Sequence, residues 1–161
     1  MINENRPTDA QPSPPVVNVH ANVIAEDDGN SIKYRLEPRD DNSEPYVTGA
    51  TEMTFPNGPE RYKIHFHIVD EDCSYNLKFK GSMPICAQDG EACPVSGGIK
   101  TEQLRPDGPP SEKFMGIENC NSCAGPVSFA LFFKDQNTKE DVEPFDPIMQ
   151  NGGGGTTFAL R

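Results

Sequence analysis

The segment Arg61-Tyr62-Lys63-Ile64-His65-Phe66-His67-Ile68-Val69 decides the fold class of this chain. Its apolar and polar side chains alternate, with Tyr62, Ile64, Phe66 and Ile68 on one face and Arg61, Lys63, His65 and His67 on the other. A period of two residues is that of a β-strand with one face in the core and one face outside it. The segment therefore predicts an amphipathic strand.

The same alternation recurs in several other stretches, which are residues 16–25, 32–36, 53–55, 75–79 and 127–133. Asp28-Gly29 lies between the first two, and an Asp-Gly pair favours the positive φ angles of a hairpin turn. Shorter strands are expected near 99–104 and 113–117, and 142–145 is expected to pair back after the turn at 135–138. With 16 Pro and 14 Gly, the 161 residues disfavour long helices. The prediction is an all-β fold, an antiparallel β-sandwich of immunoglobulin-like or cupredoxin-like two-sheet architecture with long irregular loops.

The length suits a single domain. Residues 1–15 are polar and rich in proline, which predicts a disordered tail. Residues 16–151 are expected to form the sandwich. Residues 152–161 begin with four consecutive glycines, so we expect a flexible C-terminal extension there that could add an edge strand.

A formal net charge of −11 excludes two partner classes, because an acidic surface repels nucleic-acid phosphates and anionic lipids. The polar start has no apolar segment of a secretory signal, and nowhere do about 18 apolar residues run together. A cytoplasmic location is the default expectation.

Four of the five cysteines lie in the irregular stretch 81–126. Cys120 and Cys123 are two residues apart, the spacing of a metal knuckle, and Cys86 and Cys93 could complete a four-thiolate zinc site. Two alternatives stay open. The cysteines could instead form one or two disulfides, for example Cys86 with Cys93, or they could all be thiols, as Cys73 is expected to be in the core.

His65 and His67 share the polar face of one predicted strand, so both imidazoles could bind one cation. His20 becomes a third candidate ligand only if its strand pairs nearby. The simpler interpretation is that both histidines occupy a solvated face beside Arg61 and Lys63, whose positive charges disfavour a cation.

The run Phe145-Asp146-Pro147-Ile148-Met149-Gln150-Asn151, after the turn at Asn137-Thr138-Lys139, resembles the close of a small bacterial family called DP-EP. The sharpest shared motif is Asp146-Pro147-x-x-x-Asn151, and the order of strands over residues 16–151 is similar too. The resemblance implies an all-β sandwich of unknown function with no catalytic residues to carry over.

No nucleophile elbow, phosphate loop, zinc-protease motif or dinucleotide fingerprint is present in the sequence. We therefore expect a non-enzymatic domain that binds another protein or assembles with itself. A zinc-stabilised or metal-handling domain that uses the four cysteines is the first alternative, with zinc as the one candidate cofactor. A carbohydrate-binding module is the second alternative, by analogy of fold.

Overall fold

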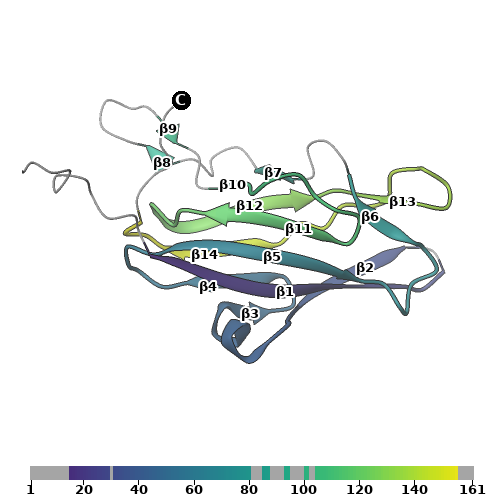
Figure 1. Cartoon of the computed structure of the whole chain (residues 1–161), viewed down its shortest axis with the longest axis horizontal. Helices are drawn as coiled ribbons and strands as arrows, with labels where there is room; N and C mark the ends of the chain where they lie inside the picture. The colour runs from purple at the N-terminus through teal and green to yellow at the C-terminus, as the bar shows by residue number, and fades with distance from the viewer. Residues whose placement is uncertain are drawn as a thin grey trace, which may run out of the picture.

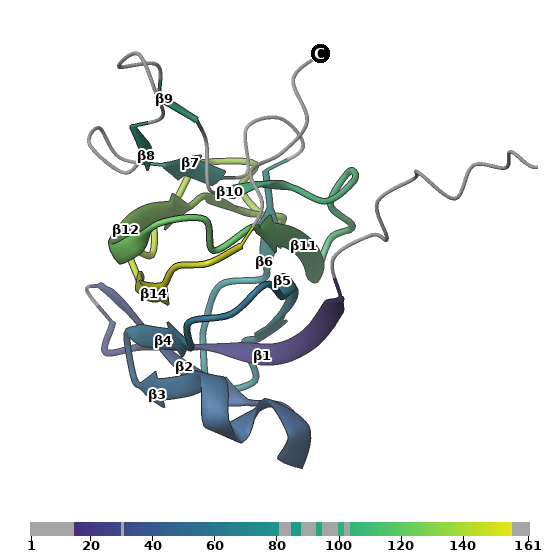
Figure 2. The ribbon, with the colours of Figure 1, turned by 90° about the vertical axis from the view of Figure 1, so that its left-hand side faces the viewer.

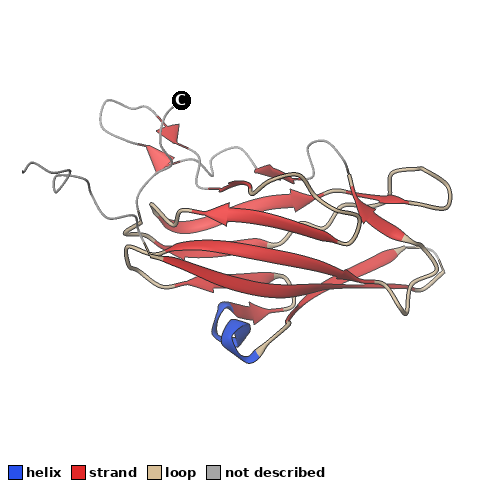
Figure 3. Cartoon of the chain, in the orientation of Figure 1, coloured by secondary structure: helices blue, strands red, loops and turns tan. Residues whose placement is uncertain are grey.

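A computed structural model describes residues 15–29, 31–80 and 104–155 of the chain, together with the backbone of three short strands between the last two ranges. The strands are β1 (Val16–Asp27), β2 (Ile32–Pro38), β3 (Val47–Gly49), β4 (Glu52–Phe55), β5 (Arg61–Val69), β6 (Leu77–Phe79), β7 (Ile85–Ala87), β8 (Cys93–Pro94), β9 (Lys100–Thr101), β10 (Leu104–Pro106), β11 (Phe114–Asn119), β12 (Ala124–Leu131), β13 (Phe133–Asp135) and β14 (Ile148–Gly152). One 3₁₀ helix, η2 (Asp41–Tyr46), is described between β2 and β3 (Figure 3). The predicted all-β class is confirmed. In the described part of the chain, no helix has the length and apolar character that a membrane crossing needs.

The strands form two five-stranded sheets and two small two-stranded sheets. The first large sheet has the order β10-β11-β5-β1-β2, and the second has the order β3-β4-β14-β12-β7. Figures 1 and 2 show the two large sheets as layers, with β1 and β5 in one layer and β12 and β14 in the other. The small sheets pair β13 with β6 and β8 with β9.

The predicted hairpin between the first two strands is confirmed. β1 and β2 pair antiparallel, with Ala25 opposite Tyr34. The turn uses Gly29 at a φ of 91°, a left-handed conformation that glycine adopts without a steric penalty. An Asp27 carboxylate oxygen accepts a hydrogen bond from the Gly29 amide. The Asp28-Gly29 pair therefore lies in the predicted turn, and the positive φ angle is that of Gly29.

Two pairings are parallel, where an entirely antiparallel sandwich was expected. β1 runs parallel to β5, and β4 runs parallel to β14. The chain leaves the first sheet after β2, contributes β3 and β4 to the second, and returns as β5 beside β1. The next strand, β6, pairs with β13 rather than with β5. Such crossovers are non-local, and a local alternation pattern contains no signal for them. The choice between immunoglobulin-like and cupredoxin-like types stays a prediction.

One hydrophobic core lies between the large sheets. The inward residues of β5 are almost fully buried, and aromatic side chains join the sheets across the core. The ring centroids of Phe55 on β4 and Tyr62 on β5 are 4.6 Å apart, and those of Phe66 on β5 and Phe129 on β12 are 6.2 Å apart. Burying each such side chain stabilises the fold by about 1.5–3 kcal/mol. The apolar half of the alternation in β5 is therefore what attaches the first sheet to the second.

A buried asparagine cluster also joins the two sheets. The amide of Asn119, at the end of β11, donates to Oδ1 of Asn151 on β14 at 2.8 Å, and Asn151 donates back to Oδ1 of Asn119 at 3.1 Å. Asn121 follows with a φ of 52°, and its Oδ1 accepts from the amide of Gly153 at 3.0 Å. Because buried amides are costly when unpaired, this reciprocal arrangement fixes how the two strand ends meet.

The glycine run is packed against its neighbours in the part that the structure describes, whereas the sequence predicted a flexible extension from residue 152. Gly152 belongs to β14, and the amide of Gly155 donates to the carbonyl of Asn121 at 2.9 Å. A Cβ at Gly155 would lie 1.9 Å from the carbonyl oxygen of Cys120, so only glycine fits there. The packed part of the domain therefore reaches residue 155, and the predicted edge strand beyond it falls outside the described residues.

Replacing Gly152 by alanine is expected to destabilise the fold. A Cβ at Gly152 would lie 2.3 Å from the backbone nitrogen of Asn57, so the strand and the loop would have to separate. We expect the free energy of unfolding to fall by roughly 1–3 kcal/mol, measured by urea denaturation. Gly49→Ala is the matched control, because its Cβ would make an ordinary 3.7 Å contact with the Glu52 side chain. Equal stability of the two variants would contradict this packing.

Candidate functional site

The polar half of β5 faces away from the core and forms the centre of a continuous surface. We call this surface the outer strip. It consists of the outward side chains of residues 61–67 of β5 and of neighbouring side chains that contact them directly or, for Arg105, through Glu118. These residues are Arg61, Lys63, His65, His67, Asn18, His20, Phe114, Glu118, Arg105 and Asp107. β5 has a strand on each side, β1 and β11, so the strip lies on a rigid part of the sheet.

Three histidines gather on the outer strip. The parallel register of β1 and β5 places His20 directly opposite His65, and their rings stack with centroids 4.5 Å apart and planes 15° apart. The ring of His67 lies 5.8 Å from that of His20. Phe114 on β11 adds a fourth ring, 5.7 Å from His65 and 5.1 Å from His67. We call these four side chains the histidine cluster.

The cluster is fixed by polar contacts at its edges. Nε2 of His65 donates to Oδ1 of Asn18 at 2.9 Å. The backbone of His20 is held by the segment after β2. Its amide donates to Oγ of Ser43, and its carbonyl accepts from the amide of Arg39. Nε2 of His67 is buried and has no hydrogen-bond partner among the described residues.

The environment favours the neutral form of two of these imidazoles. The pKa of His67 is lowered to about 4, chiefly by burial and then by the positive charge of Arg39 and by the neighbouring imidazoles. The pKa of His65 is also lowered, first by burial and then by His20, while Asp107 acts in the opposite direction. At neutral pH, His65 and His67 therefore present uncharged, half-buried rings.

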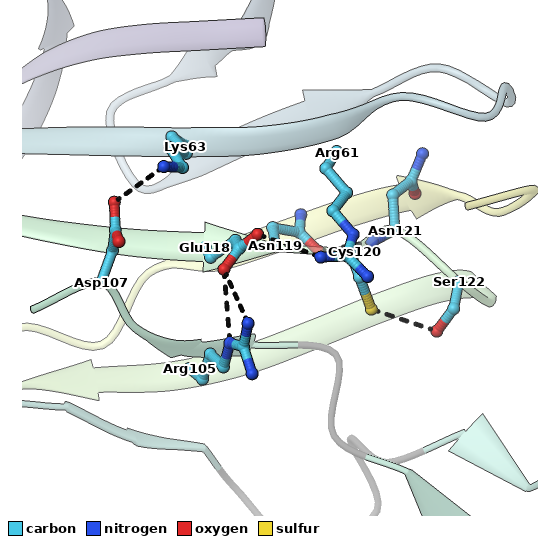
Figure 4. A network of polar contacts seen from close by, with 9 residues as sticks. All are labelled: Arg61, Lys63, Arg105, Asp107, Glu118, Asn119, Cys120, Asn121 and Ser122. Carbon is cyan, nitrogen blue, oxygen red and sulfur yellow. Dashed lines mark hydrogen bonds and ion pairs between the residues drawn. The ribbon is translucent and has the colours of Figure 1, made fainter. Parts of the chain in front are cut away.

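A network of ion pairs adjoins the cluster. Figure 4 shows Glu118 on β11 with its carboxylate directed at the guanidinium group of Arg105, at 3.2 Å. The second Glu118 oxygen lies 3.3 Å from Nη1 of Arg61, and the Glu118 side chain is only 11% exposed. Farther along β5, Lys63 lies 3.9 Å from Asp107. Both carboxylates of the outer strip are thus paired with cations.

The four predicted zinc ligands have different outcomes. Cys120 is a fully buried thiol whose Sγ lies 3.5 Å from Oγ of Ser122, whereas Cys123 is disulfide-bonded. The side chains of Cys86 and Cys93 lie outside the described residues. A sulfur in a disulfide cannot bind zinc as a thiolate, so the state of Cys123 favours the disulfide alternative that the sequence left open. The zinc site stays a prediction.

The prediction that His65 and His67 share a metal ion also stays untested, but the condition attached to His20 is met, since β1 does lie beside β5. Within the described residues, no three His, Cys, Asp or Glu side chains are arranged to hold a metal ion. We therefore assign no metal to the histidine cluster. Sequence reasoning missed Phe114, Glu118 and Arg105, because only strand pairing brings them to β5.

A cavity of about 280 Å³ lies at the end of the molecule where β2 begins. Its lining includes one aromatic ring, Tyr75, and three acidic side chains, Glu140, Asp141 and Glu143. Asp141 already contacts Lys80 at 3.1 Å and lies 4.0 Å from Lys134. For the carbohydrate-binding alternative, the acidic side chains of this cavity would supply hydrogen-bond acceptors beside the aromatic ring.

Neither the comparison with protein-family models nor the search of curated proteins gives a match to this chain. The resemblance to the DP-EP family therefore stays an expectation.

The ion pairs of Glu118 are expected to stabilise the sheet measurably. Glu118→Gln keeps the shape of the side chain but removes the charge that faces two arginines, so we expect a loss of about 1–3 kcal/mol in urea denaturation at pH 7. The matched control is Glu37→Gln, because Glu37 also pairs with an arginine but is 50% exposed. That variant should change stability by less than about 0.5 kcal/mol. A similar loss in both variants would show that the Glu118 network contributes nothing beyond an ordinary surface pair.

Proposed function

We propose that this protein is a non-enzymatic binding module that self-associates through the outer strip. The observation that carries the proposal is the histidine cluster, in which four half-buried rings stack on a central, rigid part of a sheet. Protein interfaces are enriched in aromatic rings and arginine at their centres and depleted in unpaired charge. The strip shares the rings and the arginines, Arg61 and Arg105, and its Lys63, Asp107 and Glu118 all lie in ion pairs.

Charge supports the same surface. The chain has 25 acidic and 14 basic residues, so two copies repel each other over most of their surfaces. On the outer strip, Arg61, Lys63 and Arg105 stand against only Glu118 and Asp107. Two copies whose outer strips face each other therefore keep their acidic surfaces apart.

The strip is also suited to a partner of its own kind. It carries both signs of charge, so a copy related by a two-fold axis can place its carboxylates beside the other copy's cations. The rings of His65 and His67 are neutral at pH 7 and already partly desolvated, so covering them costs little. The β framework needs no rearrangement before contact.

The small size of the strip is typical of a weak association. Four strands spaced about 4.8 Å apart and about seven residues long cover about 450 Å² on each copy. Two such faces bury about 900 Å², which is below the roughly 1,200–2,000 Å² of stable specific interfaces and within the range of weak, transient ones. We therefore expect a weak dimer, with a Kd of about 10–100 µM.

Sedimentation velocity across a concentration series tests the proposal directly. The wild-type protein should shift from monomer to dimer as its concentration rises through the expected Kd. His65→Glu places a carboxylate in the centre of the strip and should keep the protein monomeric throughout. Asn137→Glu is the matched control, since it adds the same charge at an exposed turn outside the strip, and it should dimerise like the wild type. A wild-type protein that stays monomeric well above about 100 µM would contradict self-association.

The carbohydrate-binding alternative would use the cavity beside Tyr75, whose acidic side chains supply hydrogen-bond acceptors. We place it second, because Asp141 is already shared between Lys80 and Lys134 and a single ring lines the cavity.

A further inference from the structure

We propose that the histidine cluster is an acid-sensitive switch, in which protonation of His65 and His67 weakens the parallel pairing of β1 with β5. The proposal is independent of the self-association above, because it concerns the stability of the fold itself. Its starting point is a simple count. The chain has three histidines, and all three lie in this one cluster.

The geometry makes the cluster sensitive to charge. Stacked imidazoles attract one another as neutral rings, but two imidazolium ions with centroids 4.5 Å apart repel. Nε2 of His67 is shielded from solvent and meets no acceptor among the described residues, so a proton placed on it has no counter-charge there. Protonation therefore converts a stacking contact between β1 and β5 into a repulsive one.

The charged groups around the cluster come from every neighbouring segment and do not cancel this effect. Arg39, after β2, raises the cost of a charge on His67, and Lys63 on β5 does the same for His65. Asp107, after β10, partly offsets the charge on His65 but already pairs with Lys63. Asp40 interacts with His20 and also accepts a hydrogen bond from the amide of Ser43. Phe114 on β11 brings no charge.

The direction of the effect follows from linkage. The pKa values of His65 and His67 are lowered by folding, so between the unfolded value near 6.5 and the folded values the unfolded chain binds more protons. Stability is then complete above about pH 6.5 and falls as the pH drops toward 4. Because the rings are only half-buried, we expect roughly a tenfold change in the unfolding equilibrium constant between pH 7.5 and pH 5 from the cluster.

The experiment is urea denaturation at pH 7.5 and pH 5 on the full chain, with the wild type, His67→Gln and the triple variant His20→Gln/His65→Gln/His67→Gln. The triple variant reports the pH dependence that arises from all other groups. The wild type should lose roughly tenfold more in its unfolding equilibrium constant than the triple variant does, and His67→Gln should lie between them. If the triple variant fails to fold, the comparison of His67→Gln with the wild type decides alone.

Arg39→Gln supplies an independent variant that leaves all three histidines in place. The variant removes the cation that lowers the pKa of His67, together with the hydrogen bond that Nη1 of Arg39 donates to Oδ1 of Asn22 at 2.7 Å. The variant should therefore be less acid-sensitive than the wild type. NMR titration of the three imidazole signals gives a second readout, in which at least one ring should titrate well below pH 6. Histidines that all titrate near 6.5, or a triple variant as acid-sensitive as the wild type, would overturn the proposal.

Discussion

The pairing of β1 with β5 is the constraint on which the rest of the structure depends. It runs in parallel from Val16 opposite Arg61 to Ile24 opposite Val69. Because side chains alternate between faces, this one register places Val19 and Ile64 in the core and His20 beside His65 outside it. A slip of one residue would exchange the two faces of β1, burying imidazole and amide groups while exposing valines. The core and the candidate site are thus two consequences of the same alignment.

The second sheet makes that alignment rigid. Aromatic contacts such as Phe66 with Phe129 attach the inner face of β5 to β12, and the reciprocal amide pair of Asn119 and Asn151 ties the end of β11 to β14. With its inner side fixed, β5 can hold rings and paired charges at defined distances on its outer side. The proposed binding surface and the proposed acid switch therefore use one set of residues in different ways. Neutral rings favour a contact with another copy, and charged rings loosen the strand beneath it.

The sequence was sufficient for the features that depend on local order. Alternation in residues 61–69 showed the strand and its two faces, and Asp28-Gly29 showed the hairpin. The parallel strand pairings could not be predicted from the sequence. The paired strands are separated along the chain by strands of the other sheet, and the sequence of neither strand indicates its partner. For this reason the sequence does not predict that the ring of His20 stacks on that of His65, or that the ring of Phe114 contacts the histidines. The four glycines predict flexibility, and the sequence contains no signal for the close approach of the Cys120 carbonyl to Gly155. The disulfide at Cys123 was one of three alternatives that spacing alone could not separate.

A nuclear Overhauser spectrum of the imidazole ring protons at neutral pH measures the register of β1 on β5 most directly. With three histidines in the chain, single substitutions assign each ring unambiguously. We expect strong cross-peaks between the rings of His20 and His65, and contacts from the Phe114 ring to His65 and His67. Absence of a His20–His65 cross-peak, with both rings resolved, would contradict the parallel register and with it the assignment of the outer strip.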